Sequence, residues 1–399
     1  MQKRALFLGA AYAQIPVLEE AKSRGWYIIT CDYLPNNPGH SLADESYDVS
    51  TTDFEKVLQL AKKVKPDFVI AYASDPAAPT AAWVSEQLGL LGNSYKSIQL
   101  LSEKDLFRQF LTENGFNSPK AISISRSDDL NKLKTLEFPI IIKPTDSSGS
   151  KGVTRVDFIE QAEQAIRYAL TFSRNNRIIA EEFIECDGNQ LHGDGFVVNG
   201  KLVFCYLGDQ HYNKKINPFV PYSTTWPSTK SEAIISKIEK EIQKAITLSE
   251  FKNGPINIEV RLSNSGKIYI MEIGPRSGGN FVPQIIKYAT NFDMVKTTLD
   301  YYENVDINVD CQNYKREYSA YYVIHNQLNG ILGDIKLDPV LDIYIKEFHQ
   351  YIKPGEKVKS FQGANAAIGV LLLLFNSWEE MDFYIENMNK FITLKVEKD

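Results

Sequence analysis

The sequence predicts a mixed α/β and α+β protein, with a parallel, Rossmann-like N-terminal domain followed by a part with antiparallel sheets. Three observations support this prediction. The chain opens on a strand, a glycine turn, a helix and a second strand. Short strands and helices then follow in blocks instead of alternating strictly. At 399 residues, with 43% hydrophobic and 24% charged residues, the chain can bury two or three cores.

Composition narrows the kind of partner. The formal net charge is -6, and acidic and basic residues are interspersed, so we expect neither a nucleic-acid surface nor a membrane surface. The expected partner is a small molecule. Cys31, Cys186, Cys205 and Cys311 lie far apart without metal-type spacing, which suits packing roles in a reducing cytoplasm.

The first segment is expected to form a parallel sheet. "RALFLGA" reads as a strand, "QIPVLEEAKSRG" as a helix and "YIITCD" as the next strand. A basic tip, a short apolar run and an Ala-x-Ala ending also resemble a secretory signal, but we favour the strand. Asp32 stands where an acid would reach a ribose, yet "GAAYAQ" lacks the second and third glycines of a dinucleotide fingerprint. A nicotinamide enzyme is therefore not expected.

The central segment is expected to be built on antiparallel strands. It begins with a helix in "SEKDLFRQFLTENGF", whose apolar residues Leu106, Phe107, Phe110 and Leu111 share one face. Short strands such as "AISIS", "RIIAEEFI" and "INIEVRL" follow, with helices at 158–172 and 230–250. Blocks of this kind predict an α+β architecture.

The stretch "KPTDSSGSKGV" predicts a hairpin flap that binds an anion. It lies between two strands and lacks the P-loop spacing, so no helix N-terminus is expected there. Its glycines allow φ > 0, which lets successive N–H groups turn toward one anion. Lys143 and Lys151 add positive charge. A solvated surface hairpin is the alternative.

The segment "AEEFIECDGNQLHGDGF" is a further candidate part of a binding site. "IIAEEFI" is an apolar strand whose exposed main chain could hydrogen-bond an adenine edge. Gln190, His192 and Asp194 alternate, so they share one face if the strand continues. For His192 a satisfied core histidine is the alternative interpretation.

The stretch "INIEVRLSNSGKIYIMEIGPRSGGN" predicts a hairpin that holds a divalent cation. A two-residue turn at Asn264 and Ser265 would place Glu259 opposite Ile270, with Glu272 diagonally across on the same face. Two carboxylates this close repel each other unless a cation lies between them, and hard oxygen ligands suit Mg²⁺. Arg276, in "GPRSGG", offers an anion contact. A surface acid pair balanced by lysines is the alternative.

Together these motifs resemble the ATP-grasp superfamily over nearly the whole chain. The sequence is most similar to the branch that contains carbamoyl-phosphate synthase large subunits, biotin carboxylase and purine-pathway ligases. The resemblance implies a Rossmann-like pre-ATP-grasp domain at residues 1–100, an ATP-grasp domain with antiparallel sheets at 101–305 and a small C-terminal α+β domain at 306–399.

The resemblance also implies a role for each matching position. Lys104 and Lys143 would reach the ATP phosphates, and a flap would cover the β- and γ-phosphates. A hinge would hold adenine, and Gln190 would meet the ribose. Glu259 and Glu272 would bind Mg²⁺, with Mn²⁺ as an alternative, and Arg276 would act with Lys143 at the transferred phosphate. The flap residues are Ser148, Gly149, Ser150, Lys151 and Gly152, and the hinge residues are Glu181, Glu182, Phe183 and Ile184.

One position departs from the family pattern. The metal strand commonly reads E-x-N-P-R, whereas this chain reads "EIGPR", with Gly274 in the asparagine position. Water or Asn280 could replace the missing oxygen ligand. The sequence leaves open whether the site holds one metal or two, or has lost turnover.

The resemblance implies an ADP-forming ligase that joins a small-molecule carboxylate to an amine through an acyl phosphate. The alternatives are a bicarbonate-activating carboxylase, a carbamoyl-phosphate-synthase-like enzyme and a non-catalytic ATP-binding module. Members of this branch often form homodimers. Asp75, Gln14 and His211 are further candidates for lining the ligand site.

Overall fold

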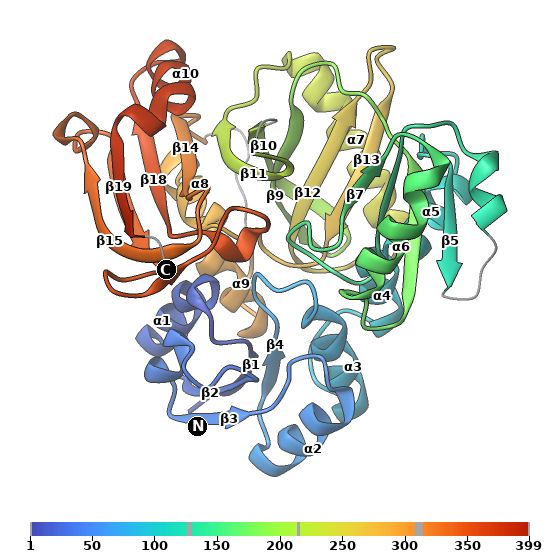
Figure 1. Ribbon diagram of the computed structural model, residues 1–399. Coiled ribbons are helices and arrows are strands. Elements are labelled where there is room, and N and C mark those ends of the chain that lie inside the picture. The colour runs from blue at the N-terminus through green and yellow to red at the C-terminus, as the bar shows by residue number, and fades with distance from the viewer. Residues whose placement is uncertain (1, 126–129, 214–215, 308–313, 398–399) are drawn as a thin grey trace.

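The computed structural model describes residues 2–125, 130–213, 216–307 and 314–397, so Cys311 lies outside the described residues. A parallel sheet forms the lower part of Figure 1, and antiparallel sheets stand above it. The predicted combination of α/β and α+β parts is confirmed. No helix of the described part of the chain is long and apolar enough to cross a membrane.

The N-terminal part is a parallel sheet covered by helices. Its elements are β1 (Arg4–Leu8), α1 (Ile15–Ser23), β2 (Tyr27–Asp32), β3 (Glu45–Asp48), α2 (Phe54–Val64), β4 (Phe68–Ile70), α3 (Ala78–Leu88) and α4 (Tyr95–Ser102). The strand order is β3-β2-β1-β4, and Leu6 of β1 lies beside both Ile29 and Val69. The apolar run "RALFL" is therefore a central strand, buried by helices on both faces as expected for a parallel sheet.

A small antiparallel lobe follows. Its elements are α5 (Lys104–Glu113), β5 (Ala121–Ser125), β6 (Ile140–Pro144), β7 (Thr154–Val156), α6 (Ala162–Leu170) and β8 (Arg177–Glu182). The strand order is β5-β8-β6-β7. The stretch between β6 and β7 is the flap that the sequence predicts, because these two strands pair antiparallel.

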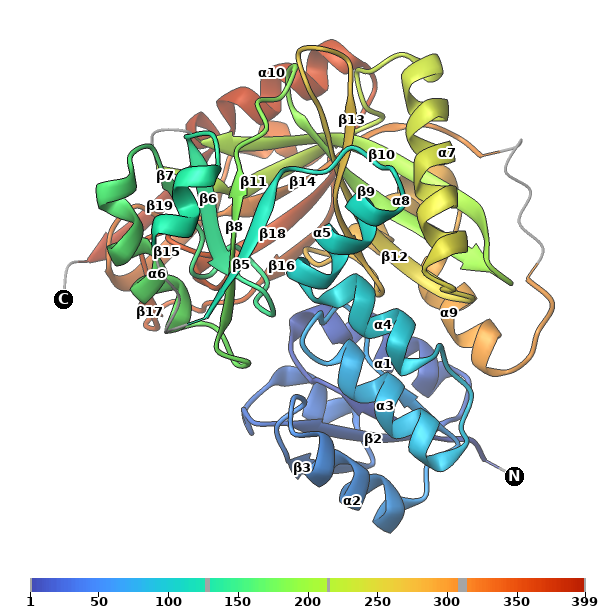
Figure 2. The same ribbon diagram turned by 90° about the vertical axis from the view of Figure 1, so that its right-hand side faces the viewer.

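The largest sheet has eight strands and forms the floor of the site. Its first elements are β9 (Gln190–Val198), β10 (Lys201–Asn213), β11 (Asn217–Trp226), α7 (Glu232–Leu248), β12 (Gly254–Leu262), β13 (Ile268–Gly274), α8 (Val282–Thr290) and α9 (Met294–Tyr302). Figure 2 shows α7 lying along this sheet. Ile238, Ile242 and Ile246 of α7 pack against the face of β12 that carries Ile256 and Ile258.

The C-terminal part extends the same sheet. Its elements are β14 (Tyr318–Ile324), β15 (Gly330–Leu337), β16 (Ile345–Gln350), β17 (Lys357–Val358), β18 (Gly369–Phe375), α10 (Trp378–Asn387) and β19 (Ile392–Glu397). The order β13-β12-β9-β10-β11-β14-β18-β16 runs without a break across the division predicted at residue 305. The other division, at residue 100, falls inside α4. The domain limits stay predictions.

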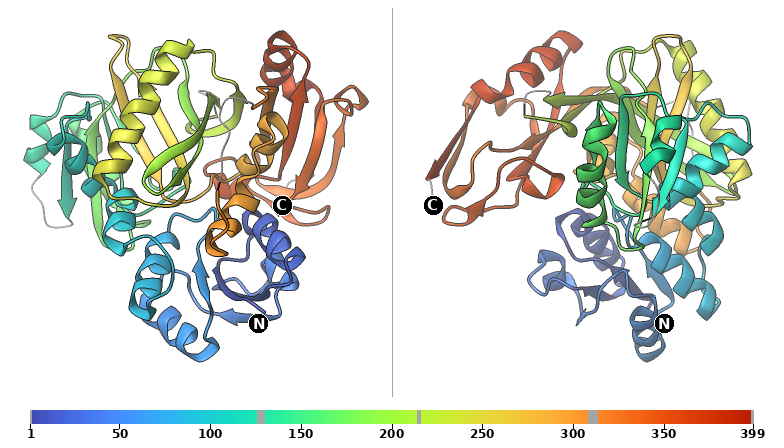
Figure 3. Two further views of the ribbon diagram at one scale, coloured as in Figure 1. Left: turned by 180° about the vertical axis from the view of Figure 1, so that it is seen from behind. Right: turned by 45° about the vertical axis from the view of Figure 1, so that its right-hand side comes forward.

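Helix α9 joins the large sheet to the N-terminal part. Figure 3 shows it reaching down to the N-terminal sheet. Arg24, at the end of α1, pairs with Asp300 and Glu303 at 2.9 Å each, and the Trp26 indole N–H donates to Glu303 at 2.8 Å. Val295 and Leu299 of α9 belong to the same buried cluster as β1. The N-terminal part is thus held to the large sheet by apolar packing and by ion pairs.

The register expected for the acidic hairpin is wrong in one respect. Leu262 pairs with Ile268, so the turn is one residue longer than predicted and includes Gly266 at φ 77°. A β-bulge at Met271 then shifts the ladder by one more residue, and Glu259 lies directly opposite Glu272 instead of opposite Ile270. The prediction that both carboxylates share one face is confirmed.

Gly208 of β10 tests how tightly the strands pack beneath the site. A Cβ atom there would lie 2.3 Å from the Thr225 carbonyl oxygen and 2.8 Å from the Trp226 ring. We expect Gly208→Ala to lower the free energy of unfolding by about 1–3 kcal/mol, because neither the backbone nor the buried indole can move away cheaply. Thermal unfolding measures the effect. Gly279→Ala, where a Cβ meets nothing within 4 Å, is the control, and an equal loss in both variants would contradict the packing argument.

Candidate functional site

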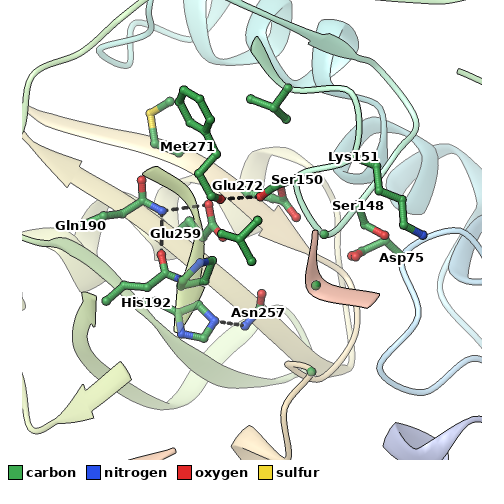
Figure 4. Close-up of a pocket in the computed structure, with 18 of the residues that line it drawn as sticks. Asp75, Ser148, Ser150, Lys151, Gln190, His192, Asn257, Glu259, Met271 and Glu272 are labelled. Carbon is green, nitrogen blue, oxygen red and sulfur yellow. Dashed lines mark hydrogen bonds between the residues drawn. The ribbon is translucent and has the colours of Figure 1, made fainter. Parts of the chain in front are cut away.

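The predicted site residues converge on one cleft of about 390 Å³. The cleft is lined by the small lobe, the large sheet, Asp75 of the N-terminal part and Ala364 of the C-terminal part. Figure 4 shows a close-up of the lining side chains. Of the residues assigned by the resemblance, those lining the cleft are Lys104, Lys143, Ser148, Gly149, Ser150, Lys151, Glu181, Gln190, Glu259, Glu272 and Arg276.

Four assigned residues do not line the cleft: Gly152, Glu182, Phe183 and Ile184. Gly152 lies at the base of the flap with φ 74°, and a Cβ there would contact the Pro144 ring at 3.0 Å. Phe183 follows β8, and the guanidinium of Arg261 lies 5.1 Å from its ring centroid. The Ile184 carbonyl oxygen accepts a hydrogen bond from Arg261 Nη1 at 3.0 Å. The assignment of the hinge to adenine stays a prediction.

The flap reaches across the cleft to the far wall. Gly149 and Ser150 both have positive φ, 65° and 59°, so the tip takes the left-handed turn that the glycine-rich sequence predicts. Ser150 Oγ donates to the Phe219 carbonyl oxygen of β11 at 2.6 Å. A Cβ at Gly149 would lie 3.3 Å from the Ala364 side chain. The flap therefore covers the cleft in this structure.

A buried ion cluster anchors one side of the cleft. Glu181 of β8 accepts from Arg108 Nε at 2.8 Å and pairs with Lys143 of β6. Burial opposes ionisation of Glu181, but Arg108 and Lys143 outweigh it and lower its pKa to about 2. Burial, together with Arg108 and Lys104, lowers the pKa of Lys143 to about 8, although Glu181 favours the charged form. Lys143 is thus a partly compensated cation beside the flap.

Lys104 connects the flap to the carboxylates. It stands at the first position of α5, and its Nζ donates to the Ser147 carbonyl oxygen at 2.8 Å. The same Nζ lies 3.9 Å from Glu272 Oε2. Lys104 and Lys143 therefore both present positive charge between the flap and the acidic hairpin.

The acidic pair lies on the floor of the cleft. Glu259 of β12 and Glu272 of β13 are direct cross-strand neighbours. Burial, followed by the charge of Glu272, raises the pKa of Glu259 to about 7. The Gln190 amide nitrogen donates to Glu259 Oε2 at 3.0 Å, and the Gln190 oxygen accepts from Arg261 Nε at 2.7 Å. The predicted contact of Gln190 with ribose stays a prediction.

Arg276 is held by the N-terminal part. Its Nε and Nη2 donate to the two carboxylate oxygens of Asp75 at 2.5 and 2.6 Å. This pair raises the pKa of Arg276 further and lowers the pKa of Asp75 despite the burial of both groups. A Cβ at Gly274 would lie 3.1 Å from Asp75 Oδ1. Gly274 thus leaves room for Asp75 to reach Arg276.

A buried polar network runs beneath the acidic pair. His192 Nδ1 lies 3.1 Å from Thr224 Oγ1, and its Nε2 lies 3.1 Å from the Asn257 amide nitrogen. Burial lowers the pKa of His192 to about 3, so the imidazole is neutral. Asp194, on the same strand face, accepts from the Asn257 amide at 2.7 Å and from the Gly278 N–H at 2.8 Å. His192 is therefore a hydrogen-bonded core histidine, the alternative that the sequence left open.

The arrangement fits a nucleotide with a divalent cation. Lys104 and Lys143 provide positive charge beneath a flap whose backbone is turned by positive φ values. Opposite them, two carboxylates on rigid strands offer the hard oxygens that Mg²⁺ prefers. Burial, followed by the charge of Glu272, raises the pKa of Glu259, and a bound cation would favour the charged form of this carboxylate.

Sequence reasoning missed several lining or anchoring residues. Arg108 lies four positions after Lys104, so the helical period places both on one side of α5. Asn257 lies two positions before Glu259, so strand alternation places both on one face. Those spacings were usable signals. Tyr321 and Phe361, in the C-terminal part, also line the cleft and left no local signal.

Comparison with known families identifies the central part. Residues 136–284 match the model of the ATP-grasp domain. The chain contains an ATP-grasp domain. It is 26% identical over 281 residues to a formate-dependent phosphoribosylglycinamide formyltransferase of Prochlorococcus marinus, covering 69% of this chain and 70% of that protein. It is also 22% identical over 311 residues to the C-terminal section of the carbamoyl phosphate synthase large chain of Aquifex aeolicus, covering 72% of this chain and 56% of that section.

Solved ATP-grasp structures share the whole fold. The L-amino acid ligase of Bacillus licheniformis superposes with a TM-score of 0.83 at 22% identity, covering 100% of this chain and 99% of that chain. The biotin carboxylase domain dimer of Hydrogenobacter thermophilus 2-oxoglutarate carboxylase, in complex with MgADP and bicarbonate, has a TM-score of 0.78 at 15% identity, covering 99% and 91%. The predicted superfamily and branch are confirmed, and the predicted cofactors, ATP and Mg²⁺, agree with these findings.

The lowered pKa of Lys143 predicts how nucleotide binding depends on pH. Only the protonated amine attracts phosphate, so the affinity for a non-hydrolysable ATP analogue should be full below pH 8 and weaken above it, by up to about tenfold per pH unit. Isothermal titration between pH 7 and 9.5 measures this. Lys143→Arg, which stays charged, should remove the pH dependence. Affinity of the unmodified protein that stays constant to pH 9.5 would contradict the assignment.

Proposed function

We propose that the protein is an ATP-dependent carboxylate–amine ligase that works through an acyl phosphate and releases ADP and phosphate. The observation that carries the proposal is the opposition, across one cleft, of a lysine-bearing flap and a pair of facing carboxylates. This arrangement suits the terminal phosphates of a nucleotide better than any other part of a ligand. The relative that acts with formate supports a carboxylate as one substrate.

Each side of the cleft would have a separate task in this reaction. Lys104, Lys143 and the N–H groups of residues 148–152 would hold the terminal phosphates. Glu259 and Glu272 would hold Mg²⁺, which neutralises phosphate charge when bound. Each such contact is worth roughly 3 kcal/mol in comparable sites. The hinge residues 181–184 would take adenine, and Gln190 would take the ribose.

Arg276 is the proposed contact of the transferred phosphate. In this structure Nε and Nη2 of Arg276 donate to the carboxylate of Asp75, and Nη1 donates to the Ser277 carbonyl oxygen at 3.0 Å. The guanidinium is therefore fixed in orientation before any ligand enters. A fixed cation near the acidic pair can stabilise charge without reorganising at the moment of reaction.

The flap would protect the intermediate. An acyl phosphate that met water would hydrolyse before the amine arrived. The hydrogen bond from Ser150 to Phe219 and the approach of Gly149 to Ala364 close the cleft over the proposed phosphate position. Substrates would enter when these few contacts open, as in other enzymes with mobile lids.

Two other functions have specific support. The structural neighbour that holds bicarbonate supports a bicarbonate-activating carboxylase or a carbamoyl-phosphate-synthase-like enzyme. Gly274 and the neutralisation of Arg276 by Asp75 favour a non-catalytic ATP-binding module. For the leading function we propose small-molecule carboxylate and amine substrates and no role for nucleic acid or membranes. We also propose that the protein forms a homodimer and works in the cytoplasm.

The reaction products, and the compounds that their formation requires, separate these functions. With a mixture of carboxylic acids, amino acids and bicarbonate, we expect ADP and inorganic phosphate, because Lys104, Lys143 and the flap would serve the terminal phosphates. Hydroxylamine should intercept the acyl phosphate as a hydroxamate. Omitting one compound at a time then identifies the substrates. AMP and pyrophosphate would refute the mechanism, and no turnover with a broad panel would favour the binding module.

The acidic pair predicts a second result. Glu272→Gln should lose at least about a hundredfold in magnesium-dependent ADP formation, the size of effect seen when one charge-stabilising group is removed. The thermal midpoint without nucleotide should stay at or above that of the unmodified protein, because the change relieves repulsion with Glu259. Glu86→Gln, at an exposed carboxylate of α3, is the control. Unchanged turnover in Glu272→Gln would show that the pair binds no metal.

A further inference from the structure

Asn257 occupies a central position in the floor of the cleft. It lies on β12 two residues before Glu259, so both side chains emerge from the same face of the strand. Its cross-strand neighbours are Asp194 on β9 and Gly274 on β13. The side chain is deeply buried, with 5% of its surface exposed, and it lines the cleft.

The hydrogen bonds of Asn257 fix the orientation of its amide. The amide nitrogen lies 2.7 Å from Asp194 Oδ1, 3.2 Å from the Gly193 carbonyl oxygen and 3.1 Å from His192 Nε2. The first two groups can only accept, so the nitrogen must face them. His192 agrees with this orientation. Thr224 Oγ1 donates its proton to the Tyr321 hydroxyl, so it accepts from Nδ1 of His192. Nε2 of the neutral imidazole then carries no proton and accepts from the Asn257 amide nitrogen.

The amide oxygen of Asn257 is consequently left facing the cleft. Figure 4 shows the nitrogen toward His192 and the oxygen on the opposite side. No described residue donates a hydrogen bond to this oxygen. Gly274, directly across the ladder, has no side chain to cover it. The oxygen is therefore open to the cleft, where a ligand can reach it.

Three oxygen-bearing side chains therefore meet on adjacent strands. Glu259 and Glu272 form one cross-strand pair, and Asn257 begins the next pair on the same face. Among the described residues no group of three or more His, Cys, Asp or Glu side chains is placed to hold a metal. A third protein ligand would then be of another type, and an amide oxygen is a hard ligand that Mg²⁺ and Mn²⁺ accept.

We propose that the amide oxygen of Asn257 is the third protein ligand of a divalent-cation site completed by Glu259 and Glu272. The proposal rests on the function proposed above. Both oxygens of Asp75, the acid beside Gly274, already accept from Arg276, and the Asn280 side chain is held at the Tyr321 hydroxyl, to which its amide nitrogen donates. The network of His192 and Asp194 positions the Asn257 oxygen, so the site is oriented by residues that do not touch the cation.

Substitutions can separate a ligand role from a purely structural one. Asn257→Leu keeps the branched outline of the side chain and removes both the oxygen and the donor. The double variant combines Asn257→Asp with Asp194→Asn. It exchanges donor and acceptor in the hydrogen bond between positions 257 and 194, and position 257 still presents an oxygen to the cleft. The tautomer of neutral His192 can reverse to match. If Asn257 is a ligand, the leucine variant should bind Mn²⁺ roughly ten- to a hundredfold more weakly, whereas the double variant should bind at least as tightly as the unmodified protein.

The measurement is the Mn²⁺ dissociation constant, from the free-ion signal in electron paramagnetic resonance, with and without a non-hydrolysable ATP analogue. An unchanged constant in Asn257→Leu, or an equal loss in the leucine and double variants, overturns this proposal alone. Unmodified protein that binds no Mn²⁺ overturns both this proposal and the proposed function.

A second readout is made on the unmodified protein. Protein labelled with ¹³C at the asparagine carboxamide carbon should show a strong ¹³C coupling to bound Mn²⁺ in electron–nuclear double resonance. The coupling should disappear when the label is absent from position 257, as in the double variant. Bound Mn²⁺ without such a coupling overturns the proposal.

Discussion

The mutual repulsion of Glu259 and Glu272 is the constraint around which the cleft is organised. The two carboxylates are half-buried cross-strand neighbours, and burial followed by the charge of Glu272 raises the pKa of Glu259. Positive and hydrogen-bonding groups surround them on every side: Lys104 approaches Glu272, and the Gln190 amide donates to Glu259. Strand pairing keeps the carboxylates together despite the repulsion, and a cation is the partner that would relieve it fully.

The cations of the cleft are themselves restrained by fixed acids. Arg108 and Glu181 place Lys143, and Asp75 places Arg276. Such buried pairs cost desolvation and contribute little net stability, so their value lies in orientation. Each cation keeps one side directed at the cleft while its acid holds the other. The site is thereby preorganised for a polyanion before one binds.

Contacts between distant segments complete the site. Asp75 comes from the N-terminal sheet, the flap from the small lobe and Phe219 from the large sheet. The cleft therefore exists only when all parts of the chain are assembled. A change at Gly274 would act on two parts at once, because a side chain there would press on Asp75 and so disturb Arg276. The contact between the N-terminal part and the large sheet therefore depends on a residue without a side chain at position 274.

The sequence by itself determined the fold class, the flap and the pairing of two metal-type carboxylates, because these depend on local periodicity and on residues close together in the chain. Strand alternation placed Glu259 and Glu272 on one face even though the predicted register was wrong. The tertiary structure alone decided the bulge at Met271, since a one-residue shift has no signature in the alternating pattern. It also decided which acid faces which cation, as with Asp75 and Arg276, and which way the Asn257 amide points. Those features depend on contacts between residues far apart in sequence, whose distances no local pattern encodes.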